Sequence, residues 1–356
     1  MNLAQTRKND HVRLALEQQR KDRVSAFNDL RFVHHSLNQV RQDHLDLSSH
    51  WANQDHSWPF YINGMTGGTE KTKQYNQKLA QVAHETGLPM ATGSVSIALS
   101  QPQVADSFQV VRQYNPNGFV MANLGAHHNL ENAKRAVDLL DANALQIHLN
   151  IPQEVVMPEG DRDYGMWLDN ISQIVAHLGL PVIVKEVGFG MSRETIADLI
   201  SVGVENIDVS GRGGTNFVQI ENDRRTRLDF QDLGNWGQTT PESLLEALAF
   251  QDQARILASG GIRSYLDMVK AYALGAKAVG LSGRFLALVD QLSIEDCVQV
   301  VNDWRDSIAH MMLMLGVESI EALATCPVVI NGQLRDWALS RGIDYQALAQ
   351  RQRQQS

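Results

Sequence analysis

The most constraining feature of this sequence is a regular alternation of short apolar runs with longer amphipathic segments, which begins near Trp58. The runs that we expect to be strands are Phe60–Asn63, Pro89–Gly93, Gly118–Leu124, Ala144–Asn150, Val182–Val187, Asn206–Ser210, Arg255–Ser259 and Ala278–Ser282. The segments that we expect to be helices are Thr69–Thr86, Pro102–Tyr114, Leu130–Asp141, Gly165–Leu178, Arg193–Val202, Pro241–Gln251 and Tyr265–Leu274. This alternation predicts a parallel sheet with right-handed crossovers. Eight strands favour closure into an α/β TIM (β/α)8 barrel, although an open doubly wound sheet would show the same alternation.

Flanking segments and helix ends complete the predicted architecture. Residues 1–50 form an N-terminal arm with helical character from Asn9 to Glu17, the barrel occupies 58–290, and 291–356 form a C-terminal helical extension. The extension should contain a helix over Ile294–Leu315 and a further helical pair over Ile320–Gln350. Its methionines are better suited to the core or to a subunit contact than to a cofactor. Thr240 is the expected N-cap of one helix, and Ser264 with Asp267 matches a capping box.

Charge and composition exclude several classes of function. The chain of 356 residues carries a net charge of −9, so it lacks the basic footprint of a nucleic-acid binder. An anionic small ligand stays possible, because backbone amides and a few cations can hold one. No apolar run is long enough for a membrane span, and the two cysteines show no metal or redox spacing. These features predict a cytoplasmic protein without a membrane partner.

Polar residues gather at the end of the fourth expected strand, in the stretch from His148 to Glu154. His148 and Asn150 share one face of the strand, and Gln153 and Glu154 follow just beyond it. Buried polar groups need partners, so such a group is a poor way to build a core and a good way to build a site. The alternative is a polar loop whose side chains satisfy nearby backbone groups.

Other strand ends suggest a bound anion. The turns after the last three expected strands are rich in glycine, which frees backbone amides, and TIM barrels bind phosphate at the last two strand loops. Gly260-Gly261 could equally be only a tight turn. Lys185 ends an apolar strand, where it would be costly to bury unless it meets an anion such as a reduced flavin ring or the carboxylate of Asp208. A flat ring could also lie against the small residues after Met65.

Taken together, these segments resemble type 2 isopentenyl-diphosphate delta-isomerases, which are FMN-dependent TIM-barrel enzymes. The resemblance runs from residue 5 to about Leu315. The matching segments are Arg7–His11, Asn63–Gly68, Thr92–Ser94, Ala122–Gly125, His148–Asn150 with Gln153-Glu154, Lys185–Gly188, Asp208–Thr215 and Ala258–Arg263. The first of these and the His-Leu-Asn…Gln-Glu segment are specific, whereas many FMN barrels share the last strand ends. Val95-Ser96 departs from the pattern, since many relatives carry a basic or longer polar side chain there.

The resemblance implies a role for each matching residue. The residues implied to hold FMN are Met65, Thr66, Gly67, Ser94, Asn123, Lys185, Ser210, Thr215, Gly260, Gly261, Leu281 and Ser282. Those implied to bind substrate are Arg7, Lys8, His11, His148, Asn150 and Gln153. Glu154 would carry Mg²⁺ bridging to the diphosphate, although a carboxylate near a helix N-terminus is an equally ordinary role for it.

The implied reaction converts isopentenyl diphosphate to dimethylallyl diphosphate in isoprenoid biosynthesis. A proton is added and another removed without net redox change, so FMN acts in its reduced state after priming by NADPH or another reductant. Gln153 and Glu221 are the candidate catalytic residues, with Glu221 alternatively a surface charge beside Arg224 and Arg225. Relatives assemble as tetramers or octamers, so a homo-oligomer is expected.

Two rival functions are disfavoured by the sequence. A 2-hydroxy-acid oxidase on the same fold would place a histidine base and an arginine on the seventh strand loop, and the loop Ser259–Arg263 has no histidine. A non-catalytic phosphate-ligand sensor would not need Lys185 together with the group from His148 to Glu154.

Overall fold

A closed barrel of parallel strands forms the centre of the molecule. The computed structural model describes residues 3–20 and 24–352. The barrel strands are β4 (Phe60–Ile62), β5 (Met90–Ala91), β6 (Val120–Gly125), β7 (Ala144–Leu149), β8 (Val182–Glu186), β9 (Asn206–Asp208), β10 (Arg255–Ser259) and β11 (Ala278–Leu281). The last strand pairs in parallel with the first, with Leu281 opposite Ile62, and this pairing closes the ring. The predicted TIM barrel is therefore confirmed, and the open doubly wound sheet is excluded.

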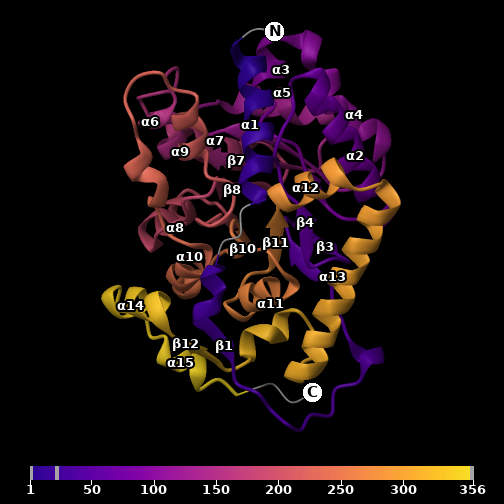
Figure 1. Ribbon diagram of the computed structural model, residues 1–356, viewed down its shortest axis with the longest axis vertical. Helices are drawn as coiled ribbons and strands as arrows, with labels where there is room; N and C mark the ends of the chain where they lie inside the picture. The colour runs from indigo at the N-terminus through magenta and orange to yellow at the C-terminus, as the bar shows by residue number, and fades with distance from the viewer. Residues whose placement is uncertain (1–2, 21–23, 353–356) are drawn as a thin grey trace.

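Helices cover the outside of the barrel between successive strands (Figure 1). They include α2 (Glu70–Thr86), α4 (Asp106–Tyr114), α5 (Leu130–Leu140), α7 (Trp167–His177), α8 (Arg193–Ser201), α10 (Thr240–Ala247), α11 (Tyr265–Ala273) and α12 (Gly283–Gln291). The first seven start within a few residues of the predicted positions, whereas α12 was not predicted. The N-cap of α10 is Thr239 rather than the predicted Thr240, because the Thr239 hydroxyl accepts the bond from the amide of Glu242. Ser264 caps α11, but Asp267 turns its carboxyl to the amide of Arg263 instead of completing the capping box.

A short hairpin closes the amino-terminal end of the barrel. Strands β2 (Ser49–Trp51) and β3 (Gln54–His56) are antiparallel, and they place Trp51 among inward-facing apolar side chains. The Trp51 ring stacks on His56 at 4.2 Å and lies 5.0 Å from the ring of Tyr61. We call this cluster of Trp51, His56, Tyr61 and Phe119 the floor of the barrel. The hairpin was not predicted, since the first strand expected from the sequence was Phe60–Asn63.

The N-terminal helix α1 (Leu3–Gln19) is longer than the predicted Asn9–Glu17 and lies across the opposite, carboxyl end of the barrel (Figure 1). Val12 and Ala15 of α1 are fully buried against Ile220 and Leu286. One face of α1 carries Ala4, Arg7, Lys8 and His11, and that face lines the cavity described below. The N-terminal helix therefore covers the carboxyl end of the barrel formed by the same chain.

The C-terminal extension contains a strand as well as helices. Helix α13 spans Ile294–Leu315 as predicted, with Met312 buried and Met314 58% exposed. Within the predicted helical pair, however, β12 (Val328–Ile330) pairs with β1 (Leu30–Phe32), ahead of α14 (Gly332–Ser340) and α15 (Gln346–Ala349). The helical prediction was wrong for residues 328–330, because a pairing of segments three hundred residues apart leaves no local pattern. The last four residues of the predicted range 291–356 lie outside the described part of the chain.

Candidate active site

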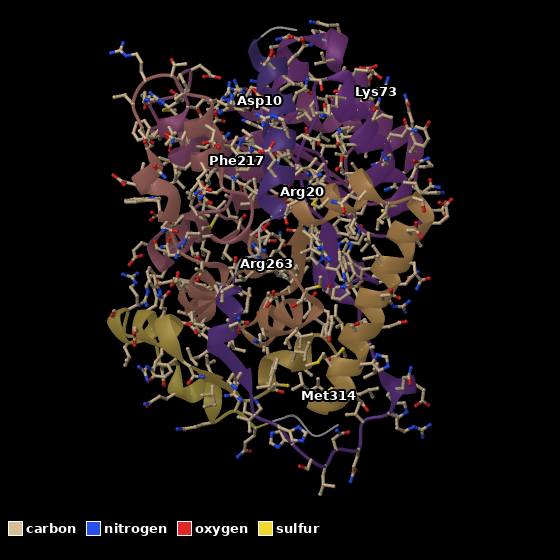
Figure 2. All side chains as sticks on the ribbon, viewed as in Figure 1. Asp10, Arg20, Lys73, Phe217, Arg263 and Met314 are labelled. Carbon is tan, nitrogen blue, oxygen red and sulfur yellow. The ribbon has the colours of Figure 1, made fainter. Side chains whose placement is uncertain are left out.

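A cavity of about 490 Å³ opens at the carboxyl end of the barrel, beneath α1. Most of the residues proposed from the sequence line it, including Arg7, Lys8 and His11 from α1. Those from the barrel are Met65, Ser94, Asn123, His148, Asn150, Gln153, Glu154, Lys185, Ser210, Thr215, Gly260, Gly261, Leu281 and Ser282. Residues from eight strand ends and from a remote helix thus meet at one site. In Figure 2, Asp10 marks α1, and Arg263, in the loop that follows β10, lies below it in the view.

Three of the proposed residues do not line the cavity. The amide hydrogen of Gly93 binds the carbonyl of Thr66, whose buried hydroxyl has no partner within the described residues. A Cβ on Gly67 would meet the ring of Phe108 at 2.0 Å, which shows that this glycine packs toward α4. Glu221, on α9 (Phe217–Asp223), is fully buried behind the cavity wall. The alternative interpretation of Glu221 as a surface charge is therefore wrong.

Glu221 is the centre of a buried polar cluster. Its Oε1 is 2.7 Å from His11 Nε2 and accepts a hydrogen bond from Gln153 Nε2 at 3.0 Å, while its Oε2 pairs with Arg224. Burial opposes ionisation, but the hydrogen bonds from His11 and Gln153 and the nearby positive charge lower the pKa of Glu221 to about 2. An ionised carboxylate therefore stands directly behind two side chains that face the cavity.

His11 is held by this cluster and by an aromatic contact. Its ring lies edge-on to that of Phe217 at 5.5 Å, and Figure 2 labels Phe217 beside α1. Because its Nε2 bonds to Glu221, that nitrogen is not directed to a ligand. The cations left facing the cavity from α1 are Arg7, which also contacts Glu159, and Lys8. Burial and the charge of Arg7 lower the pKa of Lys8 to about 8.

Glu154 lies in the first turn of the short helix α6 (Ile151–Val156), so the alternative of a carboxylate at a helix N-terminus describes its position correctly. Its Oε1 accepts from Asn150 Nδ2 at 2.8 Å and its Oε2 from the amide of Asp161 at 2.8 Å. Glu159 and Asp161 also line the cavity. Within residues 3–20 and 24–352, no three acidic, cysteine or histidine side chains form a preassembled metal site.

Lys185 projects from β8 into the cavity and is only 6% exposed. Its Nζ donates to the carbonyl of Glu186 at 2.6 Å, and among the described residues no carboxylate lies within ion-pair distance. Burial lowers the pKa of Lys185, and the charges of Asp208 and Glu186 oppose that shift. The direct pairing with Asp208 considered from the sequence is absent from this part of the chain.

Glycine-rich loops after β9 and β10 line the same cavity as Lys185. A Cβ on Gly214 would approach Gly261 N at 3.1 Å, and one on Gly260 would meet the carbonyl of Gly211 at 2.0 Å, so these loops pack too closely for side chains. Gly260 also has φ +82°, which favours glycine. Beside them, α12 begins after Ser282 without a side-chain cap. Gly283 and Arg284 of its first turn line the cavity, where amide groups and the helix dipole suit a phosphate.

Sequence reasoning missed a set of buried polar residues beneath the cavity. Gln146 lies two residues before His148 on the same face of β7, and its side chain bonds to both Asn123 and Asn63. Its position on an otherwise apolar strand was the available signal. His127, which follows β6, also lines the cavity and received no role.

Comparison with known proteins places this architecture in a family. The model of the family described as FMN-dependent dehydrogenase matches residues 109–328. The isopentenyl-diphosphate delta-isomerase of Staphylococcus haemolyticus is 50% identical over 338 residues, which cover 95% of this chain and 97% of the relative. The protein of the same name from Latilactobacillus sakei subsp. sakei is 51% identical over 335 residues, covering 94% and 96%.

Solved structures show the same fold at low sequence identity. A mutant flavocytochrome b2 with pyruvate bound aligns with a TM-score of 0.64 at 20% identity, covering 94% of this chain and 81% of that one. A mandelate oxidase mutant with benzaldehyde aligns with a TM-score of 0.62 at 18% identity, covering 92% and 95%. The barrel, the cavity at its carboxyl end and the close relatives together show that this chain belongs to the isopentenyl-diphosphate delta-isomerase family.

Proposed function

We propose that this chain isomerises isopentenyl diphosphate to dimethylallyl diphosphate with reduced FMN in the cavity. The observation that carries the proposal is the cluster in which ionised Glu221 holds His11 and Gln153 at the wall of the cavity that Lys185 also lines. A double-bond shift needs proton transfer at two carbons. The cluster offers positioned polar groups that could lie beside the apolar alkene part of the substrate. The names of the relatives support the same reaction.

The residues present fit FMN. The glycine loops and the start of α12 could hold its phosphate, while Lys185 and Asn123 could hold the polar edge of its ring system. When bound, reduced FMN supplies an electron-rich ring that can exchange a proton and stabilise positive charge on the alkene. Lys185 favours the reduced anionic form, because a buried cation without a carboxylate partner is stabilised by a nearby negative charge.

The chain's own groups would bind, orient and shield the substrate. Arg7 and Lys8 of α1 face the cavity and would hold the diphosphate, while α1 itself covers the opening and keeps water out. Gln153 is the candidate catalytic residue that touches substrate. Glu221 lies behind Gln153. We therefore assign Glu221 to positioning Gln153 and His11 and to stabilising positive charge that develops on a substrate next to them.

Mg²⁺ fits the other end of the cavity. Mg²⁺ prefers one or two carboxylates together with phosphate oxygens and retains several waters, so it does not need a preassembled protein cage. Glu154 is the proposed ligand, and Asn150 orients its carboxylate. NADPH is the proposed reductant, and it would reach the flavin through the same opening.

The oxidase alternative is less consistent with the loop after β10. Arg263 in this loop donates to the carbonyl of Gly213 at 2.9 Å, and the loop Ser259–Arg263 contains no histidine that could act as a base. The geometry therefore favours isomerisation over oxidation of a hydroxy acid.

An anaerobic assay with dithionite-reduced FMN and Mg²⁺ tests the proposal. Wild type should convert isopentenyl diphosphate, and Gln153→Ala should lower kcat by about 10²-fold or more. Glu154→Gln should raise the Mg²⁺ concentration needed for half activity. Glu159→Gln is the matched control, since Glu159 is a second carboxylate on the same cavity wall, and it should change the Mg²⁺ requirement less. Full isomerase activity in both Gln153→Ala and Glu154→Gln would refute the assignment.

Assembly and location are also proposals. Met314 and Trp236 are 58% and 60% exposed, and such side chains suit subunit contacts in a homo-oligomer, tetrameric or octameric. Sedimentation at micromolar concentration would measure the assembly. No helix in residues 3–20 or 24–352 has the length and apolar character of a bilayer span, and both cysteines are buried. We propose a cytoplasmic location.

A further inference from the structure

Five polar side chains form a continuous hydrogen-bonded chain beneath the cavity. In spatial order they are Asp208, Asn63, Gln146, Asn123 and His148. The first four are at most 5% exposed. Such groups would be costly to bury without partners, and each finds one in its neighbour. We call this set the amide chain.

The direction of the amide chain is set at Asn63. Its Oδ1 accepts a hydrogen bond from the backbone amide of Gly64 at 2.9 Å, so that atom must be the oxygen. Its Nδ2 then donates to Asp208 Oδ2 at 2.9 Å. Asp208 also accepts from the hydroxyls of Tyr61 and Ser259. Both ends of the Asn63 amide are therefore assigned by fixed partners rather than by choice.

This direction is transmitted to His148 through two more amides. Gln146 faces Asn63 Oδ1 at 3.0 Å and must present its Nε2 there, which leaves its Oε1 to accept from Asn123 Nδ2 at 3.1 Å. The oxygen of Asn123 then lies 2.9 Å from His148 Nδ1. An oxygen acceptor at that distance requires a hydrogen on the ring nitrogen.

We propose that the amide chain holds His148 as the Nδ1–H tautomer and so directs an unprotonated Nε2, a hydrogen-bond acceptor, into the cavity. Gln146, Asn63 and Asp208 are then positioning residues. The tautomer does not depend on the proposed function, whereas its meaning for the substrate does. Which nitrogen of a histidine carries the proton is commonly set by such a bond at the other nitrogen.

The surroundings keep this ring neutral. Burial lowers the pKa of His148 well below its ordinary value, and the charge of Lys185 lowers it further, with smaller contributions from His127, Lys8 and His128. Among the described residues, no hydrogen bond is made to its Nε2. A neutral nitrogen with a lone pair repels phosphate oxygens. His148 would therefore contact a donor such as a ring N–H of reduced FMN, and the diphosphate would be held by Arg7 and Lys8.

Nitrogen NMR on the FMN-loaded protein labelled with [¹⁵N]histidine tests the inference, because protonated and unprotonated ring nitrogens have very different shifts. The resonances of His148 are assigned by their loss in His148→Gln. We expect a protonated Nδ1 and an unprotonated Nε2 in wild type at neutral pH. A protonated Nε2 in wild type would overturn the inference, whatever the variants do.

Three variants separate a positioning role from a merely structural one. Gln146→Met keeps the volume but removes the acceptor for Asn123, so the His148 signals should show both tautomers and kcat should fall about tenfold. Gln146→Glu keeps an oxygen toward Asn123, and its buried carboxyl, when protonated, can still donate to Asn63 Oδ1, so this variant should keep the single tautomer. Tyr61→Phe removes an equally buried bond to Asp208 outside the amide chain and should leave the tautomer unchanged.

The outcomes also distinguish this inference from the proposed function. An unchanged tautomer in folded Gln146→Met would overturn the inference while leaving the isomerase reaction standing. The expected tautomers in a protein without isomerase activity would uphold the inference and refute the proposed function.

Discussion

The two ends of the barrel are built from the same strands and are chemically opposite. Inward-facing strand residues that surround the floor are largely apolar, and those two positions further along the same strands are polar or small. On single strands the change runs from Tyr61 to Asn63, from Met121 to Asn123, from Ala144 to Gln146, from Ile183 to Lys185 and from Leu257 to Ser259. One layer of inward-facing side chains therefore fills the amino-terminal end of the barrel with apolar groups. The next layer, two residues along each strand, forms the base of the site.

The largest effect is expected at the floor, from Trp51→Ala. Trp51 is fully buried among ring side chains, and its removal should lower the free energy of unfolding by about 3–5 kcal/mol. Denaturant unfolding of the FMN-loaded protein measures this. Because the floor does not touch the cavity, kcat of the folded fraction should stay near that of wild type. A large loss of kcat with unchanged stability would break the proposed division between the two ends.

We call the carboxyl end of the barrel, with Lys8, His11, His148 and Glu221, the mouth. There, Glu221→Gln should lower kcat more than it lowers stability. The variant keeps the volume but removes the charge that pairs with Arg224 and holds His11. We expect kcat to fall by about 10²-fold or more. Single-turnover kinetics under anaerobic conditions measure the effect. If Glu221→Gln lost its fold but kept the wild-type rate per folded molecule, Glu221 would belong with the floor.

The floor should also make stability depend on pH. Burial, reinforced by the charge of His50, lowers the pKa of His56 to about 4, against 6.5 in the unfolded chain. Between pH 6.5 and 4 the unfolded chain binds a proton that the folded chain excludes. Stability should therefore fall as pH falls through this window, by roughly 2–3 kcal/mol.

Denaturant unfolding at several pH values, on wild type and on His56→Phe, measures this contribution. The buried histidines of the mouth act in the same direction, so only the difference between the two proteins reports on His56. Identical slopes for the two proteins would contradict the prediction.

The smallest effect concerns Lys8 at the mouth. In the proposed function its ammonium form would bind the diphosphate. Its pKa of about 8 in the free protein means that this charge is lost as pH rises through that value. We expect kcat/KM to fall up to about tenfold per pH unit above pH 8, since kcat/KM reports on the free enzyme. Lys8→Arg stays charged and should move this limb to higher pH. An unshifted limb in Lys8→Arg would assign it to another group.

The amino-acid order alone predicts much of the barrel and part of the site. Alternation places the strands within a few residues, and polar side chains at strand ends direct attention to His148, Asn150 and Lys185. Glu221 was found, but its place behind Gln153 was not. No role was predicted for Gln146, because a single amide on an apolar strand indicates a site only when its hydrogen-bond partners are known.

Helical and strand periodicities are local, so the sequence by itself determined the order of elements, the helix ends and the side-chain types at each strand end. Closure of the ring is not local. It decided that Asn63 of one strand would meet Asp208 across the interior, that α1 would bring Lys8 over its own barrel, and that β1 would pair with β12. Contacts between distant segments depend on strand stagger and packing, which no window of sequence contains.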